Sequence, residues 1–327
     1  MKRQGQLIEQ IADYENLYLA YYKARKGKIE KAQVYAYGKQ LQQHLPGLQR
    51  QILAGEVDVG NYHYFTIYDP KKRLICAAPF GQRVLHHALM NVCHPFFERA
   101  QICDSYASRI GKGTYAALDR AKNFNRHYQW FLKLDVRKYF DSLDHDILKK
   151  QLYRLLKDKR VLEILARIID SYCVQPHKGV PIGNLTSQYF ANHYLAQLDH
   201  FVKEILNIPA YVRYMDDMAL WHNDKDILLH AGLRLKQYAA DELQLSLKPF
   251  CLNRRSHGLP FLGYLVYPDQ IRLAHRSRNR FIKKLGRYEQ MLTSEMWTQK
   301  EYQQHVSPLI AFTEHANAKG FRKKIMD

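Results

Sequence analysis

Apolar residues recur at helical spacing along most of the chain, and short apolar runs separate these stretches. Residues 7–54 are predicted to be helical, and Gly27 is expected to end the first helix. Thr186 or Ser187 is the expected N-cap of a long helix over 187–206. Further helices are predicted over 84–99, 115–127, 146–156, 161–172, 228–243 and from residue 275 onward.

Other segments have the composition of β-strands. Residues 62–67 and 74–78 flank a turn at Asp69-Pro70, which predicts a hairpin. Lys72 and Arg73 make the tip of this hairpin basic. Strands are also predicted over 131–134, 211–212, 218–221, 245–252 and 259–266.

Two adjacent acids, Asp216 and Asp217, lie between the apolar runs 211–212 and 218–221. The pattern predicts a hairpin with both acids at its tip. Acids between buried strands are costly unless a cation binds them. Two divalent metal ions meet this need, because such a pair clamps the attacking and leaving oxygens of a phosphoryl transfer. The alternative is an ordinary solvated Asp-Asp turn.

A third acid, Asp135, ends the predicted strand 131–134 and is expected to supply a bridging ligand. Mg²⁺ suits this set because it takes hard oxygen ligands and keeps positions for substrate phosphates. Asp141 and Asp144 follow shortly afterwards, and capping of the helix at 146–156 accounts for both.

Four motifs resemble, in order and spacing, the palm motifs of reverse transcriptases. They are Asp135 with Phe140, Gly183 in a Gly-x-x-x-Ser-Gln segment, Tyr-Met-Asp-Asp at 214–217, and Phe-Leu-Gly-Tyr at 261–264. The resemblance implies an α+β right-hand polymerase. Its expected parts are an N-terminal helical extension (1–60), fingers interleaved with the palm (61–130), a palm (131–270) and a short basic helical thumb (271–327).

The third motif is similar to that of reverse transcriptases from diversity-generating retroelements. Most reverse transcriptases have Gln before the motif's Gly and Pro after its Ser, whereas this chain has Ile182 and Gln188 there. Segments 78–84 and 105–114 also resemble finger motifs of that group. Its members copy a template-repeat RNA into cDNA and misincorporate mainly opposite adenines. Group II intron enzymes, the nearest relatives, would show Gln and Ser-Pro.

The resemblance also implies roles for single residues. Asp135, Asp216 and Asp217 would hold two Mg²⁺ ions, with Mn²⁺ as a substitute, and Ile182 and Gln188 would lie beside the template. Expected at the incoming dNTP are Lys72, Arg73, Phe140, Gly183 and Lys248; expected in the primer grip are Phe261, Leu262, Gly263 and Tyr264. The residues alone also allow Phe140 as a core residue, Ile182 as a loop anchor and Lys248 as a surface lysine.

Composition agrees with a nucleic-acid enzyme. Fifty Lys and Arg against 31 Asp and Glu give a formal charge of +19, which favours a polyanionic partner. The 24 tyrosines include candidates for stacking on unpaired bases. Five scattered cysteines without a C-x-x-C pair, and no signal peptide or membrane-spanning run, predict a cytoplasmic protein. The resemblance implies that it is bacterial, archaeal or phage-encoded.

Three functions follow as hypotheses. The first is the retroelement reverse transcriptase, binding template RNA, the cDNA–RNA hybrid and a basic oligomeric partner, the accessory variability determinant. The second is a group II intron-like reverse transcriptase or maturase, and the third is a non-catalytic RNA-binding protein on a polymerase palm. The short stretch after residue 266 leaves no room for a nuclease or integrase domain of typical size, which disfavours the second.

Overall fold

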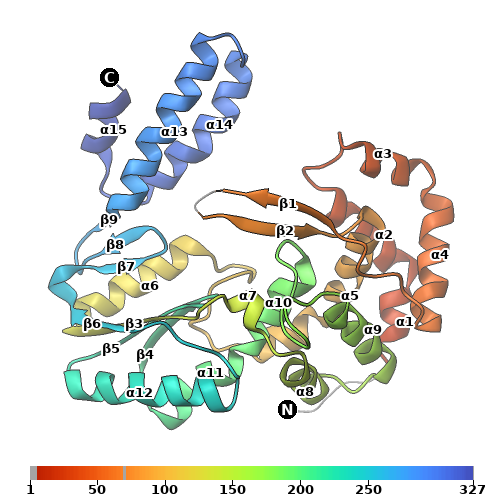
Figure 1. Cartoon of the computed structure of the whole chain (residues 1–327), viewed down its shortest axis with the longest axis horizontal. Helices are drawn as coiled ribbons and strands as arrows, with labels where there is room; N and C mark the ends of the chain where they lie inside the picture. The colour runs from red at the N-terminus through yellow and green to blue at the C-terminus, as the bar shows by residue number, and fades with distance from the viewer. Residues whose placement is uncertain (1–5, 69–70, 327) are drawn as a thin grey trace. The chain divides into compact units, whose positions relative to one another are not determined.

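The computed structural model describes residues 6–68 and 71–326. The chain forms two compact units, each assembled from three stretches of sequence (Figure 1). The first unit contains Met1–Cys103, Val136–Phe201 and Lys236–Ser246. The second contains Asp104–Asp135, Val202–Leu235 and Leu247–Asp327. In each unit, residues that are far apart in the sequence therefore lie together.

The first unit is mostly helical. Asp13 caps the second helix by accepting hydrogen bonds from the backbone amides of Glu15 and Asn16, and Gly27 follows the end of that helix with a φ of +68°. The prediction for 7–54 is confirmed. The helices are α1 Ile8–Ala12, α2 Tyr14–Arg25, α3 Ala32–Lys39, α4 Leu41–Ala54, α5 Phe80–Arg99, α7 Tyr139–Ser142, α8 His145–Leu155, α9 Lys159–Asp170, α10 Leu185–Tyr194 and α11 Ala196–His200.

One antiparallel hairpin belongs to the first unit. Strand β1 (His63–Ile67) pairs with β2 (Arg73–Ala77), so that His63 faces Ala77 and Ile67 faces Arg73. This confirms the hairpin predicted from the alternating pattern. The expected turn at Asp69-Pro70 lies outside the described residues.

The second unit is built on a four-stranded antiparallel sheet with the order β4-β5-β3-β6. Its strands are β3 Trp130–Asp135, β4 Ala210–Tyr214, β5 Asp217–His222 and β6 Cys251–Arg254. Helix α6 (Thr114–His127) packs against β4 and β5. Helix α12 (Lys225–Asp241) packs closely against β3 at Gly232. A Cβ at this position would lie 3.0 Å from Leu132 Cδ2, so the absence of a side chain permits the contact.

A second sheet and three helices complete this unit. The antiparallel order is β7-β8-β9, and α13 and α14 run side by side in Figure 1. The elements are β7 Leu259–Phe261, β8 Tyr264–Val266, β9 Ile271–Leu273, α13 His275–Thr293, α14 Gln299–Glu314 and α15 Lys319–Met326, with a π-helix at Phe201–Ile205 and a 3₁₀-helix at Arg255–His257. Within the described ranges, no helix is both long and apolar enough to span a membrane.

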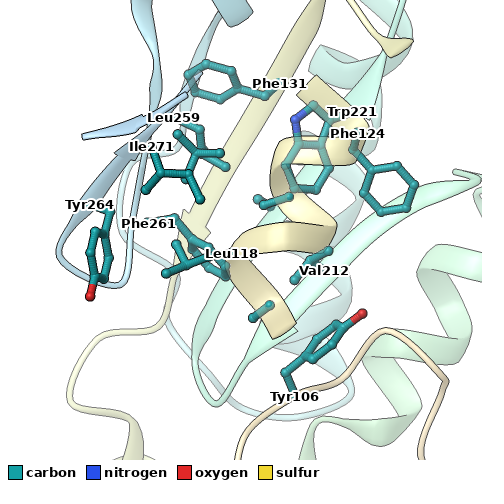
Figure 2. Close-up of a cluster of buried hydrophobic side chains, with 14 of the residues drawn as sticks. Tyr106, Leu118, Phe124, Phe131, Val212, Trp221, Leu259, Phe261, Tyr264 and Ile271 are labelled. Carbon is teal, nitrogen blue, oxygen red and sulfur yellow. The ribbon is translucent and has the colours of Figure 1, made fainter. Parts of the chain in front are cut away.

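An aromatic core joins the two sheets of the second unit to α6 (Figure 2). Phe131 and Trp221 come from the four-stranded sheet, Phe124 from α6 and Phe261 from β7. Within this core, the buried Asn125 side chain accepts a 2.7 Å hydrogen bond from Trp221 Nε1 and donates one of 2.7 Å to the Val266 carbonyl. Because both the oxygen and the nitrogen of this amide are hydrogen-bonded, it can be buried at low cost, and it fixes how the three elements meet.

Several boundaries differ from the prediction. The helix predicted over 187–206 begins at Leu185 after Asn184 and is broken at Leu195 into α10, α11 and the π-helix. Thr186 and Ser187 are therefore wrong as caps, and both lie buried within α10. Asn184 does not cap through its side chain either, because its amide bonds the backbone of Cys76 and Ala78 next to β2.

Two strand predictions and one capping prediction also need correction. The segment 259–266 is a hairpin and not one strand, since Leu262 and Gly263 turn the chain with φ angles of +52° and +90°. The strand predicted over 245–252 runs from 251 to 254. Asp144 does cap α8, whereas Asp141 lies within the short helix α7.

Candidate active site

The β4–β5 hairpin positions the acid pair. Met215 adopts a φ of +56° in the turn, and Asp217 begins β5 opposite Tyr214 of β4. On its other side, Asp217 pairs with Asp135, the last residue of β3. Because directly paired residues of antiparallel strands project from the same face, the register brings these two carboxylates together.

Two lysines neutralise this pair. Lys248 Nζ lies 2.6 Å from Asp135 Oδ2, and the backbone amide of Lys248 donates to the Asp135 carbonyl over 2.9 Å. Lys133, two residues before Asp135 on the same face of β3, forms an ion pair with Asp217. Burial lowers the pKa of Lys133 to about 7, although the charges of Asp135 and Asp216 act in the opposite direction.

Asp216, in the turn, completes the set. Burial raises its pKa above the ordinary value, and the charge of Asp135 adds to the shift. The side chain of Arg213 helps to hold the turn, since Arg213 Nη1 donates a 3.1 Å hydrogen bond to the Met215 carbonyl. Arg213 is fully buried, and its backbone amide bonds the Asp104 carbonyl.

The acids match Mg²⁺ by the chemistry of their donors, because carboxylate oxygens are its preferred ligands. Asp135 Oδ1 is buried and has no hydrogen-bond partner among the described residues, as expected of an atom reserved for a ligand. Over that same part of the chain, no group of three His, Cys, Asp or Glu side chains is arranged to hold a metal ion. Lys248 and Lys133 form ion pairs with Asp135 and Asp217 on this face.

The expected primer-grip residues form the β7–β8 hairpin. Lys133 Nζ lies 5.1 Å from the centre of the Phe261 ring, which links the carboxylate face to this hairpin. Ser277 Oγ of α13 donates to the Gly263 carbonyl over 2.7 Å, and Tyr264 donates from its hydroxyl to the Phe312 carbonyl over 2.6 Å. Leu262 occupies the turn. Helices α13 and α14 thus hold the hairpin in place.

The expected template-side residues lie in the first unit. The Ile182 carbonyl accepts a 2.8 Å hydrogen bond from the Cys76 amide, and the Ile182 side chain is half-buried. Gly183 has a φ of +117°, and a Cβ there would lie 2.8 Å from Ile75 Cγ2. A glycine is therefore required where the loop passes β2. Gln188 is exposed on α10.

The remaining expected dNTP ligands also belong to the first unit. Lys72 and Arg73 are exposed, with Arg73 opening β2. Phe140 is half-buried in α7, where its ring meets Tyr139 edge-on and its carbonyl accepts from the Val180 amide. The structure therefore gathers Asp135, Asp216, Asp217 and Lys248 in one unit, with the other dNTP and template residues in the other.

Sequence reasoning missed Lys133 and Arg213. A signal for Lys133 was available, because a lone lysine in an apolar strand, two residues before Asp135, shares the face of that acid. For Arg213 no such signal existed, since its burial depends on packing in the second unit.

Comparison with known proteins decides the family. A model of the reverse transcriptase (RNA-dependent DNA polymerase) family matches residues 68–266. The chain belongs to the reverse transcriptase family. The matched segment includes the three acids and the hairpin of the expected primer grip.

Curated relatives of this reverse transcriptase family member include intron proteins. It is 25% identical over 181 residues to the group II intron-encoded protein LtrA of Lactococcus lactis, covering 53% of this chain and 30% of that one. It is 30% identical over 86 residues to nuclear intron maturase 1 of Arabidopsis thaliana, covering 26% and 12%. A 91 kDa protein in the cob intron of Schizosaccharomyces pombe is 26% identical over 162 residues, covering 48% and 19%. The chain spans less than a third of each relative.

Solved structures confirm the expected α+β right-hand polymerase fold. Apo telomerase from Candida tropicalis, truncated from its C-terminal domain, superimposes with a TM-score of 0.53 at 13% identity, over 67% of this chain and 56% of that one. Telomerase from Candida albicans, in complex with a fragment of telomeric RNA, gives 0.52 at 12% identity over 84% and 57%. At this identity the likeness concerns the fold.

Proposed function

We propose that the protein is an RNA-directed DNA polymerase that extends a cDNA on a template RNA. The observation that carries the proposal is the register that sets Asp135 against Asp217, with Asp216 in the adjoining turn, inside the segment matched by the family model. Two Mg²⁺ ions on these acids, for which Mn²⁺ is a substitute, would activate the primer hydroxyl and stabilise the pyrophosphate leaving group. The assignment of extension, fingers, palm and thumb belongs to this proposal.

The chain's own residues have distinct tasks in this mechanism. Lys248, which is hydrogen-bonded to Asp135, would give a proton to the departing pyrophosphate. The hairpin at 261–264 supports the primer end. Lys72 and Arg73 offset the charge of the triphosphate, and Phe140 closes against the sugar so that ribonucleotides are excluded.

The finer proposal is a diversity-generating retroelement enzyme, which copies a template-repeat RNA with errors opposite adenines. Ile182 and Gln188 support it, because an apolar residue at 182 cannot make the hydrogen bonds that Gln would supply. With fewer polar contacts at the nascent pair, right and wrong pairs differ less in transition-state stabilisation. The basic accessory protein and a cytoplasmic location are parts of this proposal.

A second candidate is a group II intron-like reverse transcriptase, which the similarity to intron-encoded proteins favours equally. The genomic neighbourhood separates the two candidates. A pair of repeats near the gene that differ only at adenines supports the retroelement, whereas intron RNA flanking the gene supports the second candidate.

The polymerase proposal is tested by Asp216→Asn. Primer extension on an RNA template with Mg²⁺ should fall by at least about a hundredfold, because a ligand that stabilises the transition state is lost. Asp269→Asn, at an exposed carboxylate of the same unit, is the matched control and should keep full activity. Extension by the Asp216 variant at the control rate would support the non-catalytic RNA-binding alternative.

A further inference from the structure

His145, the first residue of α8, is buried with a relative exposure of 2%, and both nitrogens of its ring have hydrogen-bond partners. Nδ1 lies 3.2 Å from Asp170 Oδ1 at the end of α9. Nε2 lies 2.7 Å from the carbonyl oxygen of Gly179, in the segment 171–184 that connects α9 to α10. The function proposed above gives this histidine no task.

Both partners of the His145 ring are hydrogen-bond acceptors. A carbonyl oxygen can only accept, and so can an ionised carboxylate. Both bonds therefore form together only when Nδ1 and Nε2 each carry a proton, so that the ring is an imidazolium. The Asp170 carboxylate, which also pairs with Lys149 over 2.7 Å, supplies the negative charge that a buried cation needs. A neutral ring would leave one acceptor facing a lone pair.

The Gly179 peptide is buried and is held at both of its polar atoms. Its carbonyl accepts from the His145 ring, and its amide donates to the Leu143 carbonyl over 2.8 Å. The next amide, that of Val180, donates to the Phe140 carbonyl over 2.9 Å. The His145 ring thus supports the residue next to the one that is bonded to the backbone of Phe140.

We propose that His145 is a positioning residue for the choice between deoxyribonucleotides and ribonucleotides. Its imidazolium holds the Gly179 peptide, the segment 171–184 holds α7 through Gly179 and Val180, and α7 sets the place of the Phe140 ring. Loss of one ring proton releases one of the two bonds and loosens the position of Phe140. The proposal rests on the proposed function, because it takes Phe140 as the residue that meets the sugar.

Other charged or titratable side chains belong to the elements around His145. They are Asp141 on α7, Asp144 and Lys149 on α8, Asp170 on α9, His177 and Lys178 on the segment 171–184, and Tyr194 on α10. His177 is the other imidazole of this set, and an ordinary imidazole titrates between about pH 5 and 8. The His177 side chain is exposed, and its carbonyl accepts from the His145 amide over 2.9 Å. A test by pH must therefore separate these two histidines.

Primer extension on an RNA template, with matched dNTP and rNTP, measures the ratio of their kcat/KM values. Titration of the carboxylates and of the primer hydroxyl affects both substrates and cancels in this ratio. Between about pH 6 and pH 9 the wild-type ratio should fall about fivefold as the pH rises, the size expected for one lost hydrogen bond. A ratio that does not change with pH would overturn the proposal.

Asp170→Asn is the decisive variant. The new carboxamide can donate to Nδ1, so a neutral ring keeps both bonds, and the ratio should stay high at every pH. Two controls should keep the wild-type fall. Lys149→Met removes the other partner of Asp170, and His177→Gln removes the neighbouring imidazole. The same fall in Asp170→Asn as in the wild type would refute a role for the charge of the ring.

His145→Gln and His145→Leu separate positioning from packing. The Gln amide offers a donor to Gly179 at every pH, so the ratio should be independent of pH and close to the wild-type value in acid. Leu leaves the buried carbonyl without this donor and should lower the ratio about fivefold at every pH. Equal ratios in the two variants, with a lower melting temperature for His145→Leu, would show a purely structural role.

NMR of protein labelled with ¹⁵N-histidine follows the ring directly, and the His145 signals are assigned by their absence in His145→Gln. The ring should lose its proton at the pH at which the ratio falls, and two separate transitions would overturn the coupling. An enzyme that incorporates neither nucleotide would overturn the proposed function and this inference with it. An active enzyme whose ratio does not respond would overturn this inference alone.

Discussion

Asp135 and Asp217 face each other directly on adjacent antiparallel strands. Two like charges in this relationship repel, and strand pairing alone does not tolerate them well. Two ion pairs offset this repulsion: Lys248 pairs with Asp135, and Lys133 pairs with Asp217. The carboxylate face therefore already contains positive charge, and divalent cations at the acids would compete with these ammonium groups.

The first prediction concerns Lys133. Lys133→Met and Asp217→Asn should couple by about 1–3 kcal/mol in the free energy of unfolding, because each change alone leaves the other group without its counter-charge within the sheet. Asp217→Asn should therefore cost less stability in the Lys133→Met background than in the wild type. Urea unfolding of the four proteins in a double-mutant cycle without divalent ions measures the coupling. If the effects of the two changes on the free energy of unfolding add, the Lys133 and Asp217 side chains do not interact.

The second prediction concerns Ile182. Ile182→Gln should lower misincorporation opposite template adenine more than opposite the other bases, because Gln restores polar contacts at the nascent pair. Error spectra on one RNA template give the answer. Ile29→Gln, the same change at an exposed site, is the control. An unchanged error rate opposite adenine would show that Ile182 does not cause the misincorporation.

The third prediction concerns Gly183. Gly183→Ala should destabilise the first unit by about 1–3 kcal/mol, since it combines a φ of +117° with a clash 2.8 Å from Ile75 Cγ2. Gly47→Ala, in the same unit, should instead stabilise it by about 0.5–1 kcal/mol, as expected in an open helical position. Thermal unfolding of both variants compares them, and equal effects would argue against strain at 183.

The fourth prediction is a loss of stability in acid. Burial lowers the pKa of His86 to about 3 and of His193 to about 4, whereas an unfolded histidine titrates near ~6.5. Between these pH values the unfolded chain binds more protons than the folded chain. The free energy of unfolding therefore falls as the pH drops below about 6.5, and these histidines do not affect it above that pH. Each histidine contributes up to about 1.4 kcal/mol per pH unit.

Unfolding in urea at pH 7.5, 6 and 5 measures this slope. His86→Leu removes one titrating group and should make the dependence shallower. A wild-type slope in the His86 variant would show that His86 is not responsible.

The fifth prediction concerns the accessory protein of the retroelement proposal. With a charge of +19, the chain should bind RNA tightly but with little selectivity, so a partner is expected to direct it to its template. Long cDNA from the template RNA should therefore increase when the partner is added at constant salt. Equal yield and length without it would show that the partner is dispensable.

Local patterns were sufficient for much of this protein. Alternation predicted the β1–β2 hairpin, apolar runs predicted β3, β4 and β5, and Asp144 was identified as a cap, because strand pairing across a turn and helix capping depend on neighbouring residues. The ordered motifs indicated the reverse transcriptase family, which the family model confirms. The roles given to the site residues stay predictions.

Long-range packing settled the rest. The start of the predicted 187–206 helix and the hairpin within 259–266 lie where distant segments meet: Asn184 bonds the backbone of Cys76 and Ala78, and Gly263 is held by Ser277. Only the folded chain shows that Lys133 pairs with Asp217 and Lys248 with Asp135, and that the amide of Gln82 is buried without a partner among the described residues. The energy of a buried charge or amide depends on what surrounds it in space, and nearby sequence does not contain that information.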